Sequence, residues 1–330
     1  MLDIVENSSN GFNVIRGGMS YKHNDLRDMS LYKAYAQFER IPVFANEPTF
    51  DTMESLTDYS AVFNVAIGRV LNMRPIARTY NLVSHQSAFD EQAKQIEDSN
   101  FDDRRVEVVD RLFEDGKKAH RTVYFTDLKH DINSRSIDDA VVPRIDIYNS
   151  IDMSWAFQIF SGAYRDLCRN SLVFGGQKAY HQKRKHTRGL DVPAMIGKSV
   201  LSLEMFDAQR DLMNNWARTL LDAESFAYIL RNTLCKKPEK KSADYIRPES
   251  RPVNEKLLEY LLEQFFEESK ELGETVWAGY NALTHWSTHT IEARGKENQK
   301  QHDIRRKRQD EVRDVITSPD WQTVKLIVAH

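Results

Sequence analysis

Residues 105–125 read RVEVVDRLFEDGKKAHRTVYF and contain the clearest local structure signal in the chain. Two β-rich runs, Arg105–Phe113 and His120–Phe125, flank the tetrapeptide Glu114-Asp-Gly-Lys117. An Asp-Gly pair tolerates the positive φ angles of a tight hairpin turn. The pattern therefore predicts an antiparallel hairpin that turns at Asp115-Gly116.

Further strand signals extend this hairpin into a sheet. Residues 141–150 and 155–167 alternate side-chain character with the period of two that is typical of strands, and residues 151–154 form the expected turn between them. Residues 74–83 also have the composition of a strand. We expect an antiparallel sheet of about four strands with one face packed on helices.

Helical patterns lie on both sides of these strands. In residues 87–97, Phe89, Ala93 and Ile96 share one helical face. After residue 198 the apolar period changes from two to about 3.6, which favours helices. Gly273 is a typical residue at a helix C-terminus. The helices expected in this part of the chain span residues 199–221, 223–234, 255–272 and approximately 274–286.

The order of elements predicts an α+β fold rather than a doubly wound sheet, because strands and helices are segregated along the chain. We expect residues 1–70 to be an N-terminal extension or oligomer contact. Residues 71–197 then form a β-rich core with a basic stretch, and residues 198–290 are the helical part of the same domain. Residues 291–330 are expected to be a charged tail.

Composition excludes several classes of protein. The 330 residues hold 46 Lys and Arg against 49 Asp and Glu, a formal net charge of -3, which excludes a uniformly basic nucleic-acid coat. Two cysteines, Cys168 and Cys235, are too few for a disulfide scaffold. No run approaches the ~18 apolar residues that a membrane span needs. The expectation is a soluble cytoplasmic protein.

The strongest candidate binding segment is a basic stretch at residues 178–188, with five Lys or Arg, two His and no acidic residue. Such a local positive field neutralises phosphates and binds single strands without sequence preference, and an aromatic ring can stack on a base. The alternative is a solvated surface loop. The candidate nucleic-acid-binding residues in this stretch are Lys178, Tyr180, Lys183, Arg184, Lys185, His186 and Arg188.

Two other basic regions allow two interpretations each. Arg165 and Arg169 follow an apolar strand, and we count both as candidate phosphate contacts. For Arg165, the alternative is a buried ion pair with Asp146 or Asp152. The cluster Arg305–Arg308 belongs either to a helix of mixed charge, the favoured interpretation, or to an arm that grips a nucleic-acid backbone.

Catalytic and metal motifs are absent from the sequence. There is no HExxH, CxxC, GxSxG or Walker pattern, so we predict no catalytic residue, no metal ligand and no cofactor. His285 and His289 are four apart on an expected helix, where a packed edge is more common than zinc. A nuclease that uses Asp146 and Asp152 is an alternative.

Several segments, in the same order, resemble the phage- and plasmid-like family known as domain of unknown function 932. The chain has segments similar to its N-S-x-D strand end, its G-x-x-R-x-x-C-x-N segment, its R-H-T element, its Y-x-x-V-x-x-x-x-A-F segment and its T-x-W-x-x-Y-N-A-V-T helix. Met153 departs from the small residue usual there, and the first 70 residues match no family pattern. The matching segments are Thr79–Phe89, Pro143–Asp152, Phe160–Asn170, His186–Arg188 and Glu274–Trp286.

The resemblance implies a role in DNA processing in a bacterial host cell, since such proteins are often encoded among DNA-processing genes. We expect a non-catalytic protein that binds single-stranded DNA and, by a distant similarity to annealing proteins, promotes strand annealing in recombination or replication. Homo-oligomers, rings among them, are implied by the same similarity. An alternative is a counter-defence or regulatory protein that binds a host protein.

Overall fold

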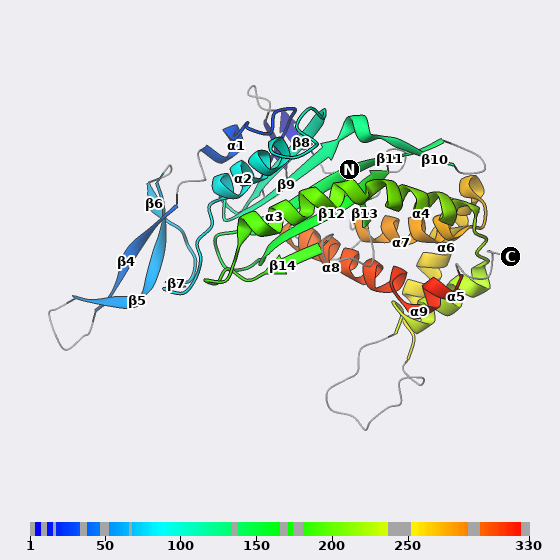
Figure 1. The fold of residues 1–330 in the computed structure, drawn as a ribbon. Coiled ribbons are helices and arrows are strands. Elements are labelled where there is room, and N and C mark those ends of the chain that lie inside the picture. The colour runs from blue at the N-terminus through cyan, green and yellow to red at the C-terminus, as the bar shows by residue number, and fades with distance from the viewer. Residues whose placement is uncertain are drawn as a thin grey trace. The chain divides into compact units, whose positions relative to one another are not determined.

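The computed structural model describes residues 4–7, 12–15, 18–33, 38–46, 53–65, 68–133, 138–165, 171–173, 181–236, 252–289 and 298–324. It has the expected α+β fold, with two sheets whose strands pair in the antiparallel sense (Figure 1). The chain forms two compact units, each discontinuous in sequence. The first comprises Met1–Asp127, Arg144–Ser161 and Lys178–Leu203, and the second comprises Leu128–Pro143, Gly162–Gln177 and Glu204–His330.

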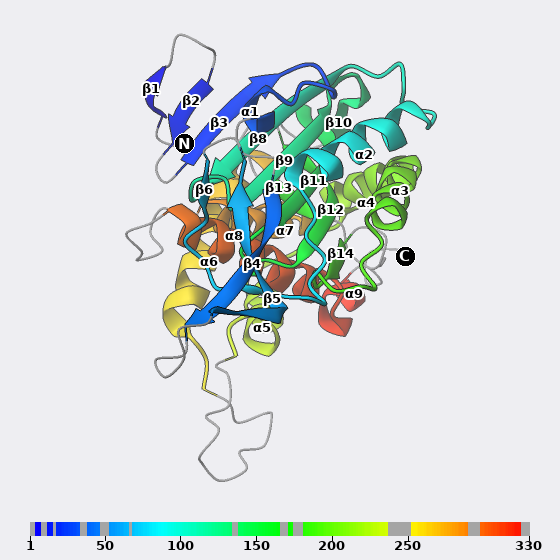
Figure 2. The ribbon, with the colours of Figure 1, turned by 90° about the vertical axis from the view of Figure 1, so that its left-hand side faces the viewer.

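The larger sheet has ten strands in the described residues, not about four. The four predicted runs are its adjacent strands β8, β9, β11 and β12, and β3, β2 and β1 follow outward from β8 (Figure 2). Its strands are β1 (Ile4–Asn7), β2 (Phe12–Ile15), β3 (Gly18–His23), β8 (Val106–Phe113), β9 (Lys118–Phe125), β10 (His130–Asn133), β11 (Asp138–Ser150), β12 (Phe157–Arg165), β13 (Ser171–Val173) and β14 (His181–Arg184).

The hairpin of β8 and β9 confirms the prediction from Asp115-Gly116. Three consecutive residues of the turn, Glu114, Asp115 and Gly116, have φ angles of 50°, 53° and 80°. The register places Phe113 opposite Lys118 and extends along both strands. Because successive side chains of a strand point to opposite faces, this register fixes which residues of β8 and β9 share a face.

A second, smaller sheet lies in the first unit. Residues 74–83 do not form the expected strand: only the two residues of β7 pair with β5. Asn81 instead bonds to the backbone of the basic stretch: its N–H donates to the His186 carbonyl at 3.0 Å. The strands of the smaller sheet are β4 (Phe38–Asn46), β5 (Met53–Asn64), β6 (Arg69–Val70) and β7 (Ile76–Ala77).

Two helices of the first unit, α2 (His85–Glu97) and α3 (Val192–Leu201), lie side by side against one face of the sheet (Figure 2). The predicted apolar face of α2 is fully buried, and Ser84 caps its N-terminus. Ser161 of β12 donates to the Ser199 carbonyl of α3 at 3.2 Å. The face of β12 that carries Ser161 is therefore the face that α3 covers.

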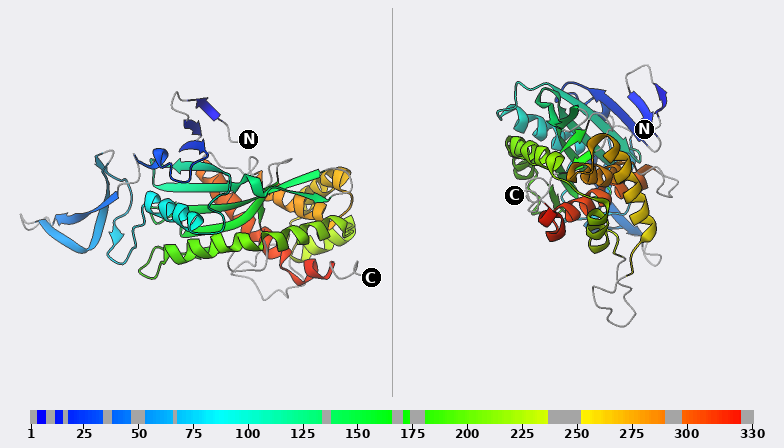
Figure 3. Two further views of the ribbon diagram at one scale, coloured as in Figure 1. Left: turned by 45° about the horizontal axis from the view of Figure 1, so that its top comes forward. Right: turned by 90° about the vertical axis from the view of Figure 1, so that its right-hand side faces the viewer.

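The helices of the second unit surround α7, which contacts α4, α6 and α8; α6 to α8 are coloured yellow to red in Figure 3. Trp277 and Tyr280 of α7 are 0% and 1% exposed, and α6 ends at Gly273 with φ 70°, as predicted. The helices are α4 (Phe206–Arg218), α5 (Ala223–Asn232), α6 (Glu255–Leu272), α7 (Val276–Thr288), α8 (Asn298–Ile316) and α9 (Pro319–Val324).

The single helix expected at residues 199–221 is wrong. Helix α3 begins earlier, after the N-cap Asp191, and a 3₁₀ turn at Ser202–Met205 separates it from α4. The Ser202 hydroxyl donates to the Ser199 carbonyl at 2.6 Å, a local bond of the kind that competes with regular helix. The other short helical segments are α1 (Ser30–Lys33) and a 3₁₀ turn at Thr126–Leu128.

Among the helices of the described residues, none has both the length and the apolar character that crossing a bilayer requires.

Candidate nucleic-acid interface

Residues 181–184 of the basic stretch form strand β14, which hydrogen-bonds to β12 alone among the described strands. Its register with β12 pairs Phe160 with His181 and Phe157 with Arg184. Alternation along a strand places Lys183 on one face and Arg184 on the other. Positive charge is thus available on both sides of this strand.

Four cations of the stretch are exposed: Lys183, Arg184, Lys185 and Arg188. In the part of the chain that the structure describes, no carboxylate lies within ion-pair distance of any of them. Their charge is therefore not neutralised internally. Unneutralised cations on a surface attract phosphates and release the counterions condensed on a nucleic acid.

The backbone that carries these cations is fixed to the first unit at several points. The Gln182 amide donates to the Met195 carbonyl of α3 at 2.7 Å. Further along, Thr187 pairs with Tyr80, and Leu190 donates to the Thr187 carbonyl at 2.9 Å. The cations therefore project from an ordered frame, which lowers the entropic cost of ordering them on a ligand.

His186, a predicted binding residue, is only 4% exposed. Its ring stacks on Tyr80 with centroids 5.2 Å apart, and its Nδ1 lies 3.1 Å from the Asn81 carbonyl. Burial lowers the pKa of this imidazole below its ordinary value. The structure therefore gives His186 an internal packing role, and the neutral form of the ring is favoured.

Arg165 is also buried, at 1% exposure, and its guanidinium lies 2.7 Å from Glu268 of α6. The internal ion pair expected as its alternative role is present, but the partner is Glu268 and not Asp146 or Asp152. The other three predicted binding residues, Lys178, Tyr180 and Arg169, lie outside the described residues.

The cluster Arg305–Arg308 lies in α8, a helix of mixed charge as favoured from the sequence. Arg305 donates to the Thr288 carbonyl at 3.2 Å, and Arg308 donates to the Trp286 carbonyl at 2.7 Å. The Arg308 guanidinium also stacks over the Trp286 ring at 4.6 Å. These two arginines cap the C-terminal end of α7, which is a structural role.

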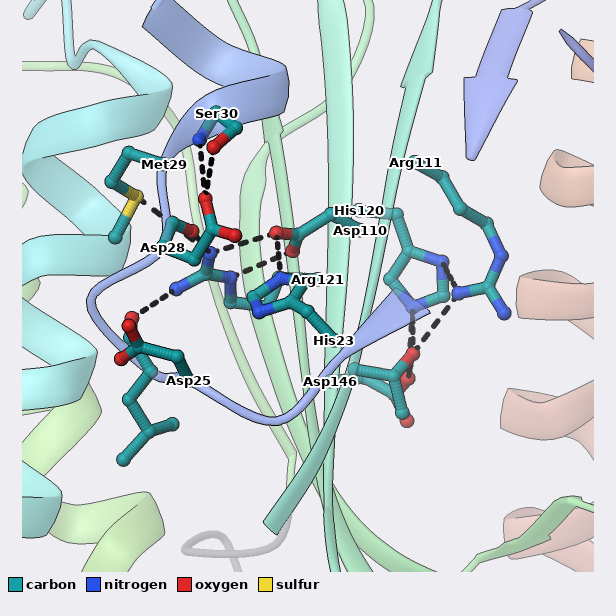
Figure 4. Close-up of polar contacts among 12 residues, drawn as sticks. His23, Asp25, Asp28, Met29, Ser30, Asp110, Arg111, His120, Arg121 and Asp146 are labelled. Carbon is teal, nitrogen blue, oxygen red and sulfur yellow. Dashed lines mark hydrogen bonds and ion pairs between the residues drawn. The ribbon is translucent and has the colours of Figure 1, made fainter. Parts of the chain in front are cut away.

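A buried polar cluster lies on one face of the larger sheet (Figure 4). Its centre is Asp146 of β11, which is 1% exposed. One carboxylate oxygen of Asp146 accepts from His120 and from Thr122, both at 2.8 Å, and the other lies 2.6 Å from Arg144. Both oxygens of the carboxylate are therefore engaged within the fold.

The charge states of this cluster follow from burial and pairing. Burial opposes ionisation of Asp146, but the Arg144 guanidinium and the hydrogen bonds hold its pKa at about 2. Burial lowers the pKa of His120 to about 4, against the raising effect of Asp146. At neutral pH the imidazole is neutral, and its Nε2–H donates to the carboxylate, so its Nδ1 is the acceptor.

Asp110 and Arg121 form a second cluster on the opposite face, where α2 packs (Figure 4). Two Arg121 nitrogens lie 2.7 and 2.8 Å from the Asp110 carboxylate. The remaining Arg121 donors bind the carbonyls of Leu26 and Asp28, both at 3.0 Å. This guanidinium therefore connects β8 to the segment that follows β3.

The polar face around His120 is not evident from the sequence. Alternation in residues 141–150 separates Asp146 from the apolar side chains of β11, but does not show that its face is buried. The acidic pair of the nuclease alternative also has other partners: Asp152 lies 3.8 Å from Lys118. In the described residues, no group of three or more His, Cys, Asp or Glu side chains is arranged to hold a metal ion.

One comparison with known proteins gave a match. The sequence model of a family described as Domain of unknown function (DUF932) matches residues 74–309, more than half of the chain. The matched range includes β8 to β14 and all helices from α2 to α7. No curated protein and no solved structure matched the chain.

Proposed function

The chain belongs to the DUF932 family, and from that premise we propose that it is a phage- or plasmid-type DNA-processing protein that binds single-stranded DNA. The observation that carries this proposal is the set of four exposed, unneutralised cations on and after β14. They concentrate positive charge in a chain whose net charge is -3. The setting that we propose is the cytoplasm of a bacterial cell.

The proposed mechanism is electrostatic and needs no covalent step. Lys183 and Arg184 neutralise successive phosphates from the two faces of the strand, and Lys185 and Arg188 extend the track. Backbone contacts carry no sequence information and leave base edges free. A second, complementary strand can then pair with the bound one, so annealing is part of the proposal, as is a homo-oligomer that lengthens the track.

Cations on an edge strand also discourage the pairing of that strand with another sheet. This structural role predicts no affinity for nucleic acid, so a binding measurement separates it from the proposed function.

The experiment mixes the full chain with fluorescently labelled single- and double-stranded oligonucleotides of mixed sequence, with and without Mg²⁺. Fluorescence anisotropy reports binding, quenching between complementary labelled strands reports annealing, and a denaturing gel reports cleavage. We expect saturable binding with preference for the single strand, faster annealing and intact oligonucleotides. No binding at low salt would contradict the proposal, and Mg²⁺-dependent cleavage would replace it with the nuclease alternative.

A further inference from the structure

Only some of the hydrogen-bond donors of the Arg111 guanidinium, on β8, have partners among the described residues. The residue is 9% exposed, so burial of its charge is costly unless an anion or other partners compensate. Its Nη1 donates to the Thr122 hydroxyl at 3.2 Å and faces Nδ1 of His120 at 3.4 Å. Both partners are neutral, and no carboxylate among the described residues lies within ion-pair distance of Arg111.

The opposite edge of this guanidinium, formed by Nε and Nη2, makes no hydrogen bond to any described residue, and Nε is buried. Two parallel N–H groups on such an edge match the geometry of two oxygens of one phosphate or carboxylate. The neighbouring Asp146 does not supply them, because Arg144, His120 and Thr122 occupy its oxygens. Asp146 therefore gives Arg111 no carboxylate partner.

A second buried side chain on the same face also lacks partners. The register aligns Arg111 with His120 and His120 with Tyr148, and the Tyr148 ring contacts Phe160 of β12 at 5.6 Å. Gln158, two residues before Phe160, shares its face. Gln158 is 0% exposed, and its amide nitrogen and oxygen have no partner in the described part of the chain. It lies opposite Lys183 of β14, and three strand spacings of about 4.8 Å separate its strand from β8, so it does not share a small ligand with Arg111.

We propose that this face of the sheet binds a phosphate group, held side-on by the Nε and Nη2 edge of Arg111. The chemistry is shared by a free phosphate, a nucleotide and a phosphodiester backbone. Arg111 is separate from the β14 cations, since four strand spacings of about 4.8 Å divide β8 from β14. It stands whether or not the proposed function holds.

The test compares inorganic phosphate with chloride at matched ionic strength, using the full chain, isothermal calorimetry and thermal unfolding. Phosphate is expected to bind and to raise the melting temperature more than chloride does. Arg111→Gln removes the charged fork and should weaken phosphate binding roughly 10- to 100-fold. Arg111→Lys keeps the positive charge but loses the two parallel N–H groups. Its phosphate affinity should lie between that of the wild type and that of Arg111→Gln. The β14 variant Lys183→Ala, Arg184→Ala, Lys185→Ala should bind phosphate as the wild type does.

Gln158→Leu is a control for a change elsewhere on the same face of the sheet. It replaces an unpartnered buried amide by an apolar group of similar size, so it should keep or raise the stability of the unliganded protein. Thymidine monophosphate and a short oligothymidylate, each competed against phosphate, identify the source of the phosphate group. Because Gln158 lies three strands away from Arg111, Gln158→Leu should leave the affinity for inorganic phosphate and for thymidine monophosphate unchanged.

Phosphate binding by Arg111→Gln equal to that of the wild type, or no difference between phosphate and chloride in the wild type, would overturn this site. A protein that binds phosphate through Arg111 but no oligonucleotide would keep the site and refute the proposed function. Oligonucleotide binding that survives Arg111→Gln, without any phosphate effect, would refute the site alone.

Discussion

At the scale of single residues, His85 and His120 are held as neutral imidazoles inside the first unit. Burial is the main cause, and it lowers the pKa of each to about 4. In the unfolded chain the pKa of histidine is about 6.5. Between these two values the unfolded state takes up protons that the folded state refuses. Acid therefore favours unfolding in this window.

We accordingly expect stability to be level above about pH 6.5 and to fall by up to about 1.4 kcal/mol per pH unit for each of the two histidines between pH 6.5 and 4. Asp146 does not contribute in this window, because its pKa of about 2 keeps it ionised. Urea midpoints measured at pH 7.5, 6.0 and 5.0 test this. A midpoint that does not change from pH 7.5 to 5.0 would show that these imidazoles are not buried as neutral groups.

At the scale of elements, α7 supplies the core of the second unit. Trp277 is 0% exposed and packs on Tyr280 with ring centroids 5.6 Å apart. Trp277→Ala should lower the free energy of unfolding by about 3–5 kcal/mol, as for other large buried aromatics. Tyr228→Ala is the matched control, since that ring on α5 is 61% exposed and its removal should change stability by less than about 0.5 kcal/mol. Equal denaturation midpoints for the two variants would contradict this account of α7.

Elements with a local cause were predictable from the sequence. The β8–β9 turn follows from Asp115-Gly116, and α6 follows from an amphipathic run that stops at Gly273. The period of 3.6 in residues 199–221 did not reveal the 3₁₀ turn, because apolar spacing continues through it while Ser202 bonds locally. Four of the predicted cations are exposed, as expected for a charged run on an edge strand and in the segment that follows it.

The polar face around Arg111 was not predictable in the same way. Arg111 and Gln158 lie far apart in sequence, and they share a face only through the order of β8, β9, β11 and β12 in the sheet and the alternation along each strand. A charged side chain in an alternating strand is usually at the solvent face. Whether such a side chain is buried depends on which elements cover the sheet, and a local sequence pattern does not show this. His186 and Arg165 were predicted to be binding residues but are buried. The His186 ring packs on Tyr80, and the Arg165 guanidinium pairs with Glu268.

At the scale of the whole molecule, the first unit extends beyond the matched family range. The family match begins at residue 74, yet β3 pairs with β8 along its full length. At Gly18 a side chain would meet the Leu112 carbonyl at 1.9 Å, so the two backbones are in close contact there. Arg121 also depends on the carbonyls of Leu26 and Asp28. Residues 18–29 are thus part of the folded unit.

A fragment that begins at residue 74 should therefore lose cooperative unfolding, because it exposes the edge of β8 and leaves the buried Arg121 with fewer acceptors. Circular dichroism during a thermal melt is the measurement. A sharp transition for the fragment, at the melting temperature of the full chain, would show that the family range folds without these residues.

The central claim, that the β14 cations contact the phosphates of a single strand, is tested most directly by the salt dependence of binding. Oligothymidylate affinity is measured from low to moderate salt for the wild type and for Lys183→Ala, Arg184→Ala, Lys185→Ala. A control variant removes the same charges from exposed positions on α4 and α6: Arg218→Ala, Lys256→Ala, Lys270→Ala.

If all three β14 cations contact phosphate, the slope of log affinity against log salt should flatten by about 2 in the β14 variant, at roughly 0.7 per contact. The control variant should keep the wild-type slope, and all three proteins should have similar melting temperatures. A β14 variant that folds normally and binds with the wild-type affinity at every salt concentration would contradict the claim.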